Sequence, residues 1–154
     1  MPRCIHFRNA CSVVWLLLPL QAHAGRAITA TQTTYLERCG GCHGIEGVSA
    51  GAVVPDLRDQ VGLFLCSAEG RDYMLRVPNV AMSLIRDDAK LAAVMNFVAF
   101  QFSGRNRPAH LVPFTADEVH AARQLPLRNT NLAALRTSIL GRAIAACPVQ
   151  PSQP

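Results

Sequence analysis

The sequence lacks the features that mark several common functional classes. The apolar run near its start, from Ser12 to Leu20, has about nine residues, whereas a membrane-spanning helix needs roughly 20. The basic residues are scattered rather than clustered, which gives little support to a nucleic-acid-binding stripe. The chain contains no internal repeat and no low-complexity tract. After Gly25 no segment alternates cleanly between apolar and polar residues, so strands are not predicted.

The first 24 residues have the pattern of an export signal. A basic start is followed by the apolar run and then by Ala22-His23-Ala24, a small-x-small cleavage site. As an uncleaved helical anchor the apolar run would reach roughly 13 Å, against roughly 30 Å of bilayer hydrocarbon. We therefore expect residues 1–24 to be a signal peptide cleaved after Ala24. The mature chain is expected in the periplasm, without stable membrane insertion.

Loss of the leader leaves a chain of single-domain size with four cysteines. The net charge falls from +5 to +3, because Arg3 and Arg8 are removed. A mildly positive protein can be helped electrostatically toward an acidic partner. Outside the cytoplasm disulfides persist, whereas a free dithiol tends to oxidise.

The mature sequence indicates an all-α fold of helices joined by irregular loops. Helices are expected over Thr31–Cys42, Val61–Cys66, Asp87–Phe102 and Leu132–Ala146. The Asp87–Phe102 segment gives the clearest pattern, with apolar residues at helical spacing: Leu91, Val94, Met95, Val98 and Phe102. In "FTADEV" the capping-box spacing of Thr115 and Glu118 predicts another helix, which Pro126 ends.

The stretch "RCGGCHG" places Cys39 and Cys42 three residues apart, with His43 directly after the second cysteine. Three chemistries use such a pair: structural zinc, a redox-active dithiol and covalent haem attachment. Structural zinc usually takes four protein ligands, and the other candidates are widely separated in the sequence: Cys66, His110, His120 and Cys147. A thioredoxin-like dithiol belongs at a helix start after a strand, whereas this pair stands near the end of a predicted helix.

Haem attachment accounts for the histidine as well as for the cysteines. Residues three apart lie on one face of a helical turn, so Cys39 and Cys42 can each form a thioether to one vinyl group of the same porphyrin. His43 then presents its imidazole to the iron. Because Cys-x-x-Cys-His is the attachment signal of haem c, we predict one covalently attached haem c per chain.

From Thr31 to Phe102 the sequence resembles the class I cytochrome c family. The likeness consists of a helix leading into "CGGCHG", a glycine-rich loop, the "VPDL" stretch and a later helix that would cross the first. The resemblance implies a cytochrome c domain over residues 25–107 around one haem, with a C-terminal helical extension over 108–154. It also implies that the backbone carbonyl of Pro55 orients His43 through the second ring nitrogen. The alternative is that Pro55 is an ordinary loop residue, which interrupts regular structure and has no role at the iron.

The resemblance further implies a methionine as sixth iron ligand, in a loop before the last core helix. Met82 occupies that place, although the family commonly has a proline after this methionine and a longer run before the helix. Met74 is a second candidate, and Met95 is expected to be a packing residue of its helix. The alternatives beyond methionine are His110, His120 and an open iron position.

Cys66 and Cys147 are left over after haem attachment. An even pair in an oxidising compartment can form a disulfide that ties the last helix to the core. The alternative is two buried unpaired thiols, because sequence does not give the distance between them.

The expected function is that of an electron-transfer protein and not of an enzyme. Two thioethers and two axial ligands leave no position for substrate, so the haem can only give and take single electrons. The expected partners are redox proteins: a periplasmic dehydrogenase or quinol oxidase upstream, and an oxidase or reductase as terminal acceptor. The alternatives are a dedicated cytochrome subunit of a dehydrogenase, and a haem sensor or enzyme with an open sixth position.

Overall fold

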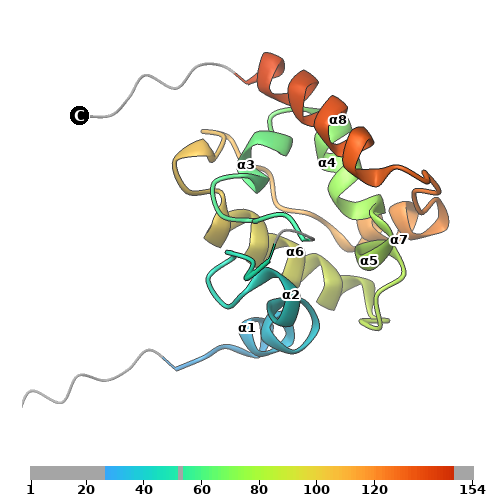
Figure 1. Cartoon of the computed structure of the whole chain (residues 1–154). Helices are drawn as coiled ribbons and strands as arrows, with labels where there is room; N and C mark the ends of the chain where they lie inside the picture. Colours follow the sequence, from blue (N-terminus) through green and yellow to red (C-terminus); the bar gives the residue numbers. More distant parts are fainter. Residues whose placement is uncertain (1–26, 52–53, 148–154) are drawn as a thin grey trace, which may run out of the picture.

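The computed structural model describes residues 27–51 and 54–147, and within these ranges all regular structure is helical (Figure 1). The predicted all-α fold is confirmed at this level. The predicted signal peptide lies outside the described residues. The helical elements, in chain order, are α1 (Ala30–Tyr35), η1 (Leu36–Gly40), α2 (Gly41–His43), α3 (Val61–Phe64), α4 (Ala68–Arg76), α5 (Pro78–Ala81), α6 (Asp88–Phe102), η2 (Gly104–Asn106), α7 (Ala116–Gln124) and α8 (Leu132–Ala146).

The first three elements form one continuous helical segment that ends at the cysteine and histidine motif. Thr29 begins it with a capping box, in which its side chain accepts from the backbone of Gln32 and the Gln32 side chain accepts from the backbone of Thr29. A π-helical turn, η1, carries Cys39. The segment ends at Gly44, whose φ is +72°. The predicted helix over Thr31–Cys42 is therefore confirmed to within one residue at each end.

Helix α6 is the central element, and α1 packs against it (Figure 1). Asp87 caps its start by accepting a hydrogen bond from the backbone N–H of Lys90. Tyr35 of the first segment packs against two rings of α6. Its ring centroid is 5.2 Å from those of both Phe97 and Phe102, which are 5.5 Å from each other. This aromatic cluster fixes the helix that carries Cys39 and His43 against the core.

Helices α3, α4 and α5 continue the fold after the glycine-rich loop. Helix α3 begins at Val61 as predicted and ends two residues before the predicted Cys66. Helix α4 was not predicted from the sequence, and Ser67 caps it by accepting a hydrogen bond from the backbone N–H of Gly70. Val77 ends it in an extended conformation, and Pro78 begins the short α5, as suits a residue without a backbone N–H.

The C-terminal helices share the hydrophobic core of the rest of the chain. Both match their predictions, since α7 has the Thr115 and Glu118 capping box and α8 runs from Leu132 to Ala146. Phe114, Val119 and Ile139 are buried in the same cluster as residues of α3, α4 and α6. The division at residues 107 and 108 stays a prediction. Within the described ranges, buried residues from both segments belong to one hydrophobic cluster.

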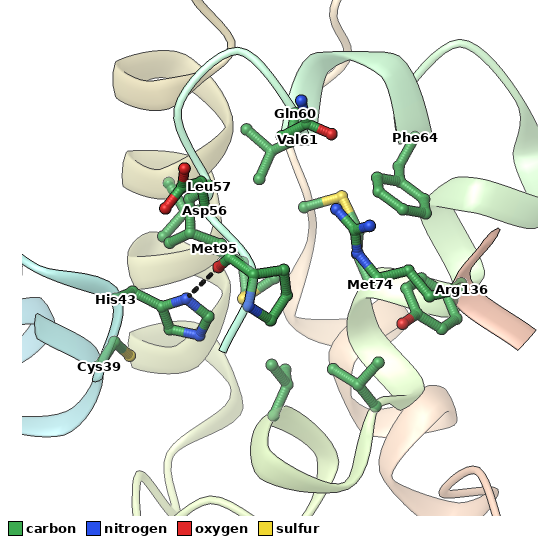
Figure 2. Close-up of a pocket in the computed structure, with 15 residues that line it drawn as sticks. Cys39, His43, Asp56, Leu57, Gln60, Val61, Phe64, Met74, Met95 and Arg136 are labelled. Carbon is green, nitrogen blue, oxygen red and sulfur yellow. Dashed lines mark hydrogen bonds between the residues drawn. The ribbon is translucent and has the colours of Figure 1, made fainter. Parts of the chain in front are cut away.

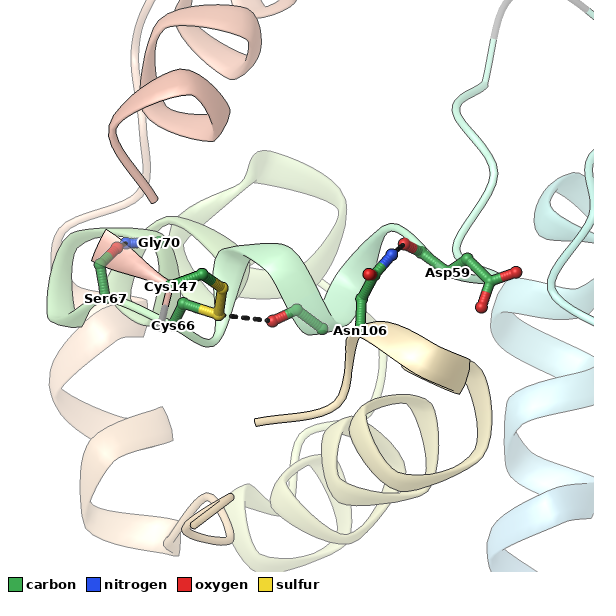
Figure 3. Close-up of a disulfide and its surroundings, with 7 residues drawn as sticks. Asp59, Cys66, Ser67, Gly70, Asn106 and Cys147 are labelled. Atoms are coloured by element: carbon green, nitrogen blue, oxygen red, sulfur yellow. Dashed lines mark hydrogen bonds between the residues drawn. A yellow bond between two sulfur atoms is a disulfide. The ribbon is translucent and has the colours of Figure 1, made fainter. Parts of the chain in front are cut away.

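A disulfide joins Cys66, just after α3, to Cys147, at the end of α8 (Figure 3). The two Cα atoms are 5.0 Å apart, which is within the usual range for a disulfide. Of the two sequence alternatives, the structure therefore contains the bridge and not a pair of free thiols. It links positions 81 residues apart and ties the last helix to the part of the chain that precedes α4.

No helix within residues 27–51 and 54–147 combines the length and the apolar character needed to pass through a bilayer.

Candidate functional site: an apolar pocket around His43

A pocket with a cavity volume of about 150 Å³, open to solvent on part of its surface, lies between the first helical segment and helices α3, α4, α6 and α8. Most of its walls are apolar. Figure 2 shows Cys39 and His43 on one side of the pocket and Phe64, Met74 and Arg136 on the opposite side.

His43 is held in the pocket wall by the backbone of Pro55. Its Nδ1 atom is 3.0 Å from the Pro55 carbonyl oxygen. A carbonyl oxygen only accepts, so Nδ1 carries the proton and donates it. In the neutral ring the lone pair is then on Nε2, the nitrogen free to bind a metal. Burial lowers the pKa of His43, although the hydrogen bond to Pro55 and the charge of Asp56 oppose this, and a lowered pKa favours the neutral ring.

The loop that carries Pro55 is itself fixed by hydrogen bonds. The Asp56 carboxylate accepts a hydrogen bond from the backbone N–H of Ser49 at 2.8 Å. Hydrogen bonds from Ser49 lower the pKa of Asp56. The Gly47 carbonyl accepts from the backbone N–H groups of Leu57 and Arg58, at 2.8 and 2.9 Å. The position of the Pro55 carbonyl is therefore set by the fold of this loop and does not depend on a single contact.

Gly44 lets the chain turn sharply after His43. Its φ of +72° and ψ of +159° fall in a region that is essentially restricted to glycine. A Cβ atom at this position would lie 2.1 Å from the Val48 carbonyl oxygen. The Tyr35 hydroxyl donates to the Gly44 carbonyl at 2.7 Å, and burial raises the pKa of Tyr35 to about 12. Gly44 and Tyr35 thus position the end of the motif against α6.

The two motif cysteines are both free thiols, and they differ in exposure. Cys39 is half-buried and lines the pocket, and burial raises the pKa of its thiol, with a smaller contribution from Cys42. Cys42 is exposed and is not among the lining residues. Within the described residues no three His, Cys, Asp or Glu side chains are placed to hold a metal ion together. The motif therefore offers one histidine nitrogen and two thiols, without a zinc-type ligand set around them.

The three methionines of the described chain are placed very differently. Met74 on α4 and Met95 on α6 are buried, at 7% and 6% exposure, and both line the pocket. Met74 lies on the side opposite His43 (Figure 2). Met82, the residue that the family resemblance favoured as sixth ligand, is 61% exposed and is not among the lining residues. The structure thus brings Cys39, His43, Pro55 and Met74 to one pocket, but it does not bring Met82 there.

The position of Met82 has a physical cause in the C-terminal helices. Arg123 of α7 donates to the carbonyl oxygens of Ala81, Ser83 and Ile85, at 3.1, 3.2 and 2.5 Å. These bonds hold the segment that contains Met82 against α7. His110 and His120 are also exposed, and neither lines the pocket. Arg123 lies outside Thr31 to Phe102, the range of the family resemblance, so the resemblance does not include these contacts. Met82 as sixth ligand stays a prediction.

The sequence reasoning missed one charged residue of the pocket, Arg136 of α8. A signal for it was present in the helical pattern. Arg136 follows Leu132 by four residues and precedes Ile139 by three, so it occupies the apolar face of α8. A charged residue on such a face indicates a specific contact for that charge.

These residues fit a haem chemically. The free Nε2 of His43 and the thioether of Met74 are the nitrogen and sulfur donors that haem iron takes, and Cys39 and Cys42 have free sulfurs for thioether bonds. The apolar walls suit a flat, mostly apolar macrocycle. Comparisons with protein-family models, with curated proteins and with solved structures find no match to this chain.

Proposed function

We propose that this chain is an exported mono-haem c-type cytochrome that carries single electrons between redox proteins. The observation that carries the proposal is the shared pocket of Cys39, His43 and Met74, with His43 oriented through the Pro55 carbonyl. A Cys-x-x-Cys-His motif alone indicates haem attachment. The oriented histidine and the buried sulfur across an apolar pocket add two independent features that such a site needs.

Each of these side chains has a separate role in the proposed site. Cys39 and Cys42 form thioethers to the porphyrin. His43 binds iron through Nε2, and its Nδ1–H donation to Pro55 fixes the ring and strengthens its donation to the metal. Met74 is the sixth ligand in place of Met82, because it is buried in the pocket wall opposite His43. A haem bound in this way supplies the exchange of one electron between ferric and ferrous iron.

The apolar side chains of the pocket tune that exchange. Val61 and Phe64 of α3 and Val98 of α6 are buried at its walls, and they give the pocket an apolar lining. A low dielectric disfavours the more highly charged oxidised form, and a methionine ligand acts in the same direction. Both effects raise the reduction potential relative to an exposed haem with two nitrogen ligands.

The proposed location and partners follow from the remaining features. The leader pattern in residues 1–24 supports export, and so does the Cys66–Cys147 disulfide, because structural disulfides are rare in the cytoplasm. The partners are exported redox proteins that act as electron donor and acceptor. Carrier contacts of this type are small and transient, below about 1,200 Å² of buried surface.

The test is a spectrum of the purified, reduced and oxidised protein, recorded with and without carbon monoxide. Haem that stays with the polypeptide after acid extraction, a low-spin spectrum and no response of the reduced protein to carbon monoxide are expected. Haem that extracts freely would reject the cytochrome. Covalent haem that binds carbon monoxide readily would reject the carrier role in favour of a ligand-binding haem protein with an open sixth position.

A further inference from the structure

Helix α8 of the C-terminal segment contributes a cation to the pocket, and nothing in the proposed electron-carrier mechanism accounts for it. The Arg136 side chain extends from α8 into the pocket, on the same side as Met74 (Figure 2). Its guanidinium carbon is 5.3 Å from the centre of the Phe64 ring. The contact with Phe64 stabilises a cation only modestly, by roughly 1 kcal/mol.

Arg136 has no carboxylate partner among the described residues, because none of the ion pairs in those ranges includes it. Asp56 is the other residue of the pocket lining that carries a full charge at neutral pH. Its carboxylate accepts from Ser49 and belongs to the loop on the His43 side. A partly buried charge in an apolar pocket is unfavourable unless an opposite charge meets it.

The other arginine of α8 shows the contrast. Arg142 is not among the residues that line the pocket, and it forms an ion pair with Glu69, with a nitrogen to oxygen distance of 2.6 Å. The same helix therefore carries one arginine with an anionic partner of its own and one that faces the pocket without one. The geometry points to an anionic group on whatever occupies the pocket.

Helix α8 is held firmly enough to keep Arg136 in place. The Cys66–Cys147 disulfide fixes its end, the Glu69–Arg142 pair links it to α4, and Ile139 is buried in the core. Three separate contacts thus fix the position of α8, from which the Arg136 side chain reaches the pocket. A helix that is already fixed does not have to be ordered when the pocket's occupant binds.

We propose that Arg136 binds a carboxylate of the pocket's occupant, which for a haem is a propionate, and that the C-terminal segment is in this way part of the cofactor site. An arginine and a carboxylate form a bidentate, charge-assisted pair. A positive charge beside the haem favours the reduced form, so Arg136 raises the reduction potential. Because this inference rests on the proposed function, its test begins with the wild-type protein carrying covalent haem.

The experiment measures reduction potentials by spectroelectrochemistry in wild type, Arg136→Met, Arg136→Lys and Arg142→Gln. Arg136→Met keeps an apolar chain over Phe64 but removes the charge, so its potential is expected to fall. Arg136→Lys keeps the charge and should recover most of the loss. Arg142→Gln removes a charge from the same helix outside the pocket and should have a potential close to that of wild type. Redox-difference infrared spectra are expected to show a shifted propionate carboxyl band only in the Arg136 variants.

The outcomes separate the two proposals. If wild-type protein has no covalent haem, the proposed function fails and this inference fails with it. If haem is attached in all four proteins and Arg136→Met has the potential and the carboxyl bands of wild type, only the role of Arg136 is rejected. A potential that falls equally in Arg136→Met and Arg142→Gln would also reject it, because the effect would then depend on net charge and not on a contact in the pocket.

Discussion

The Nδ1 atom of His43 lies 3.0 Å from the carbonyl oxygen of Pro55, twelve residues further along the chain. This bond decides which ring nitrogen carries the proton, and so it leaves Nε2 as the donor toward the pocket. The Asp56 and Gly47 hydrogen bonds keep the Pro55 carbonyl in place. A loop without regular structure therefore determines the chemistry of a side chain on a helix.

The hydroxyl of Tyr35 is expected to stabilise the end of the motif. Tyr35→Phe removes the donor to the Gly44 carbonyl but keeps the ring packed against Phe97 and Phe102. We expect the free energy of unfolding to fall by about 1 kcal/mol, the usual net contribution of such a bond. Denaturant titration followed by circular dichroism measures this change in the free energy of unfolding. Tyr73→Phe is the control, since no hydrogen bond of the Tyr73 hydroxyl to a described residue is found, and a fall of equal size there would contradict the assignment.

A methionine series distinguishes the sixth ligand from packing residues. Met74→Ala and Met95→Ala remove side chains of nearly equal burial, 7% and 6% exposed, so each should destabilise the fold by roughly 2 to 5 kcal/mol. In the protein with haem attached, Met74→Ala alone is expected to lose the sulfur-to-iron charge-transfer band at the red end of the visible spectrum and to bind carbon monoxide.

Met82→Ala completes the series as a surface control. Its side chain is 61% exposed, so we expect the band to remain and stability to change by no more than about 0.5 kcal/mol. Loss of the band in Met82→Ala, with the band retained in Met74→Ala, would return the ligand assignment to the loop before α6. It would also mean that this loop moves away from Arg123 when haem is attached.

The disulfide is expected to contribute strongly to stability. The double variant Cys66→Ala, Cys147→Ala opens a link between residues 81 positions apart, and the chain-entropy model gives a loss of roughly 4 to 5 kcal/mol for loops of this size. Thermal unfolding with and without a reducing agent measures the effect. Wild type should become less stable on reduction, whereas the double variant should not respond. Two alkylated thiols at Cys66 and Cys147 in unreduced wild-type protein would show that the bridge does not form.

The helices could largely be predicted from local patterns. Asp87 and Thr115 indicate the starts of α6 and α7, because a capping side chain acts within three residues of its own position. The end of α8 at Ala146 follows from its apolar stripe and from Pro148. Local rules did not identify α4, in which four of the nine residues are charged and the buried residues are only Gly70, Met74 and Leu75. Its start is marked by Ser67.

The candidate site could be predicted only in part, because its two walls come from different parts of the chain. Cys39, Cys42 and His43 are adjacent in sequence, so their spacing alone carries the signal. Met74 and Arg136 reach the same pocket through tertiary packing of α4 and α8, and no local pattern gives that arrangement. The exposed position of Met82 has the same origin, since Arg123, some forty residues later, holds its loop.

Glu118 links the C-terminal segment to α4. From this contact we expect a specific loss of stability in acid. Its carboxylate forms a bidentate pair with Arg71, at 2.8 and 2.9 Å, and it also accepts from the backbone N–H of Thr115. Arg71 donates in addition to the carbonyl oxygens of Val112 and Pro113 and lies 4.0 Å from the centre of the Phe114 ring. The Arg71 hydrogen bonds are the largest cause that lowers the pKa of Glu118, from 4.5 to about 2.

A lowered pKa in the folded state means that the ionised carboxylate stabilises the fold above the unfolded value of 4.5. This contribution decreases as the pH falls from 4.5 to about 2, where the folded carboxyl takes up its proton. The Glu118→Gln variant lacks this contribution to stability at every pH. At pH 7 we therefore expect the variant to be less stable than wild type by roughly 1 kcal/mol, because the carboxylate is partly exposed and solvent weakens the pair.

Denaturant titrations of both proteins at a series of pH values measure the difference in unfolding free energy. It should be constant above about pH 5 and should shrink toward zero between pH 4.5 and about 2. Asp117→Asn is the matched control, because it removes the same charge from the neighbouring position of α7, where the carboxylate forms no ion pair within the described residues. A difference that stays constant down to pH 2, or one of equal size in Asp117→Asn, would show that the Arg71–Glu118 pair does not fasten α7 to α4.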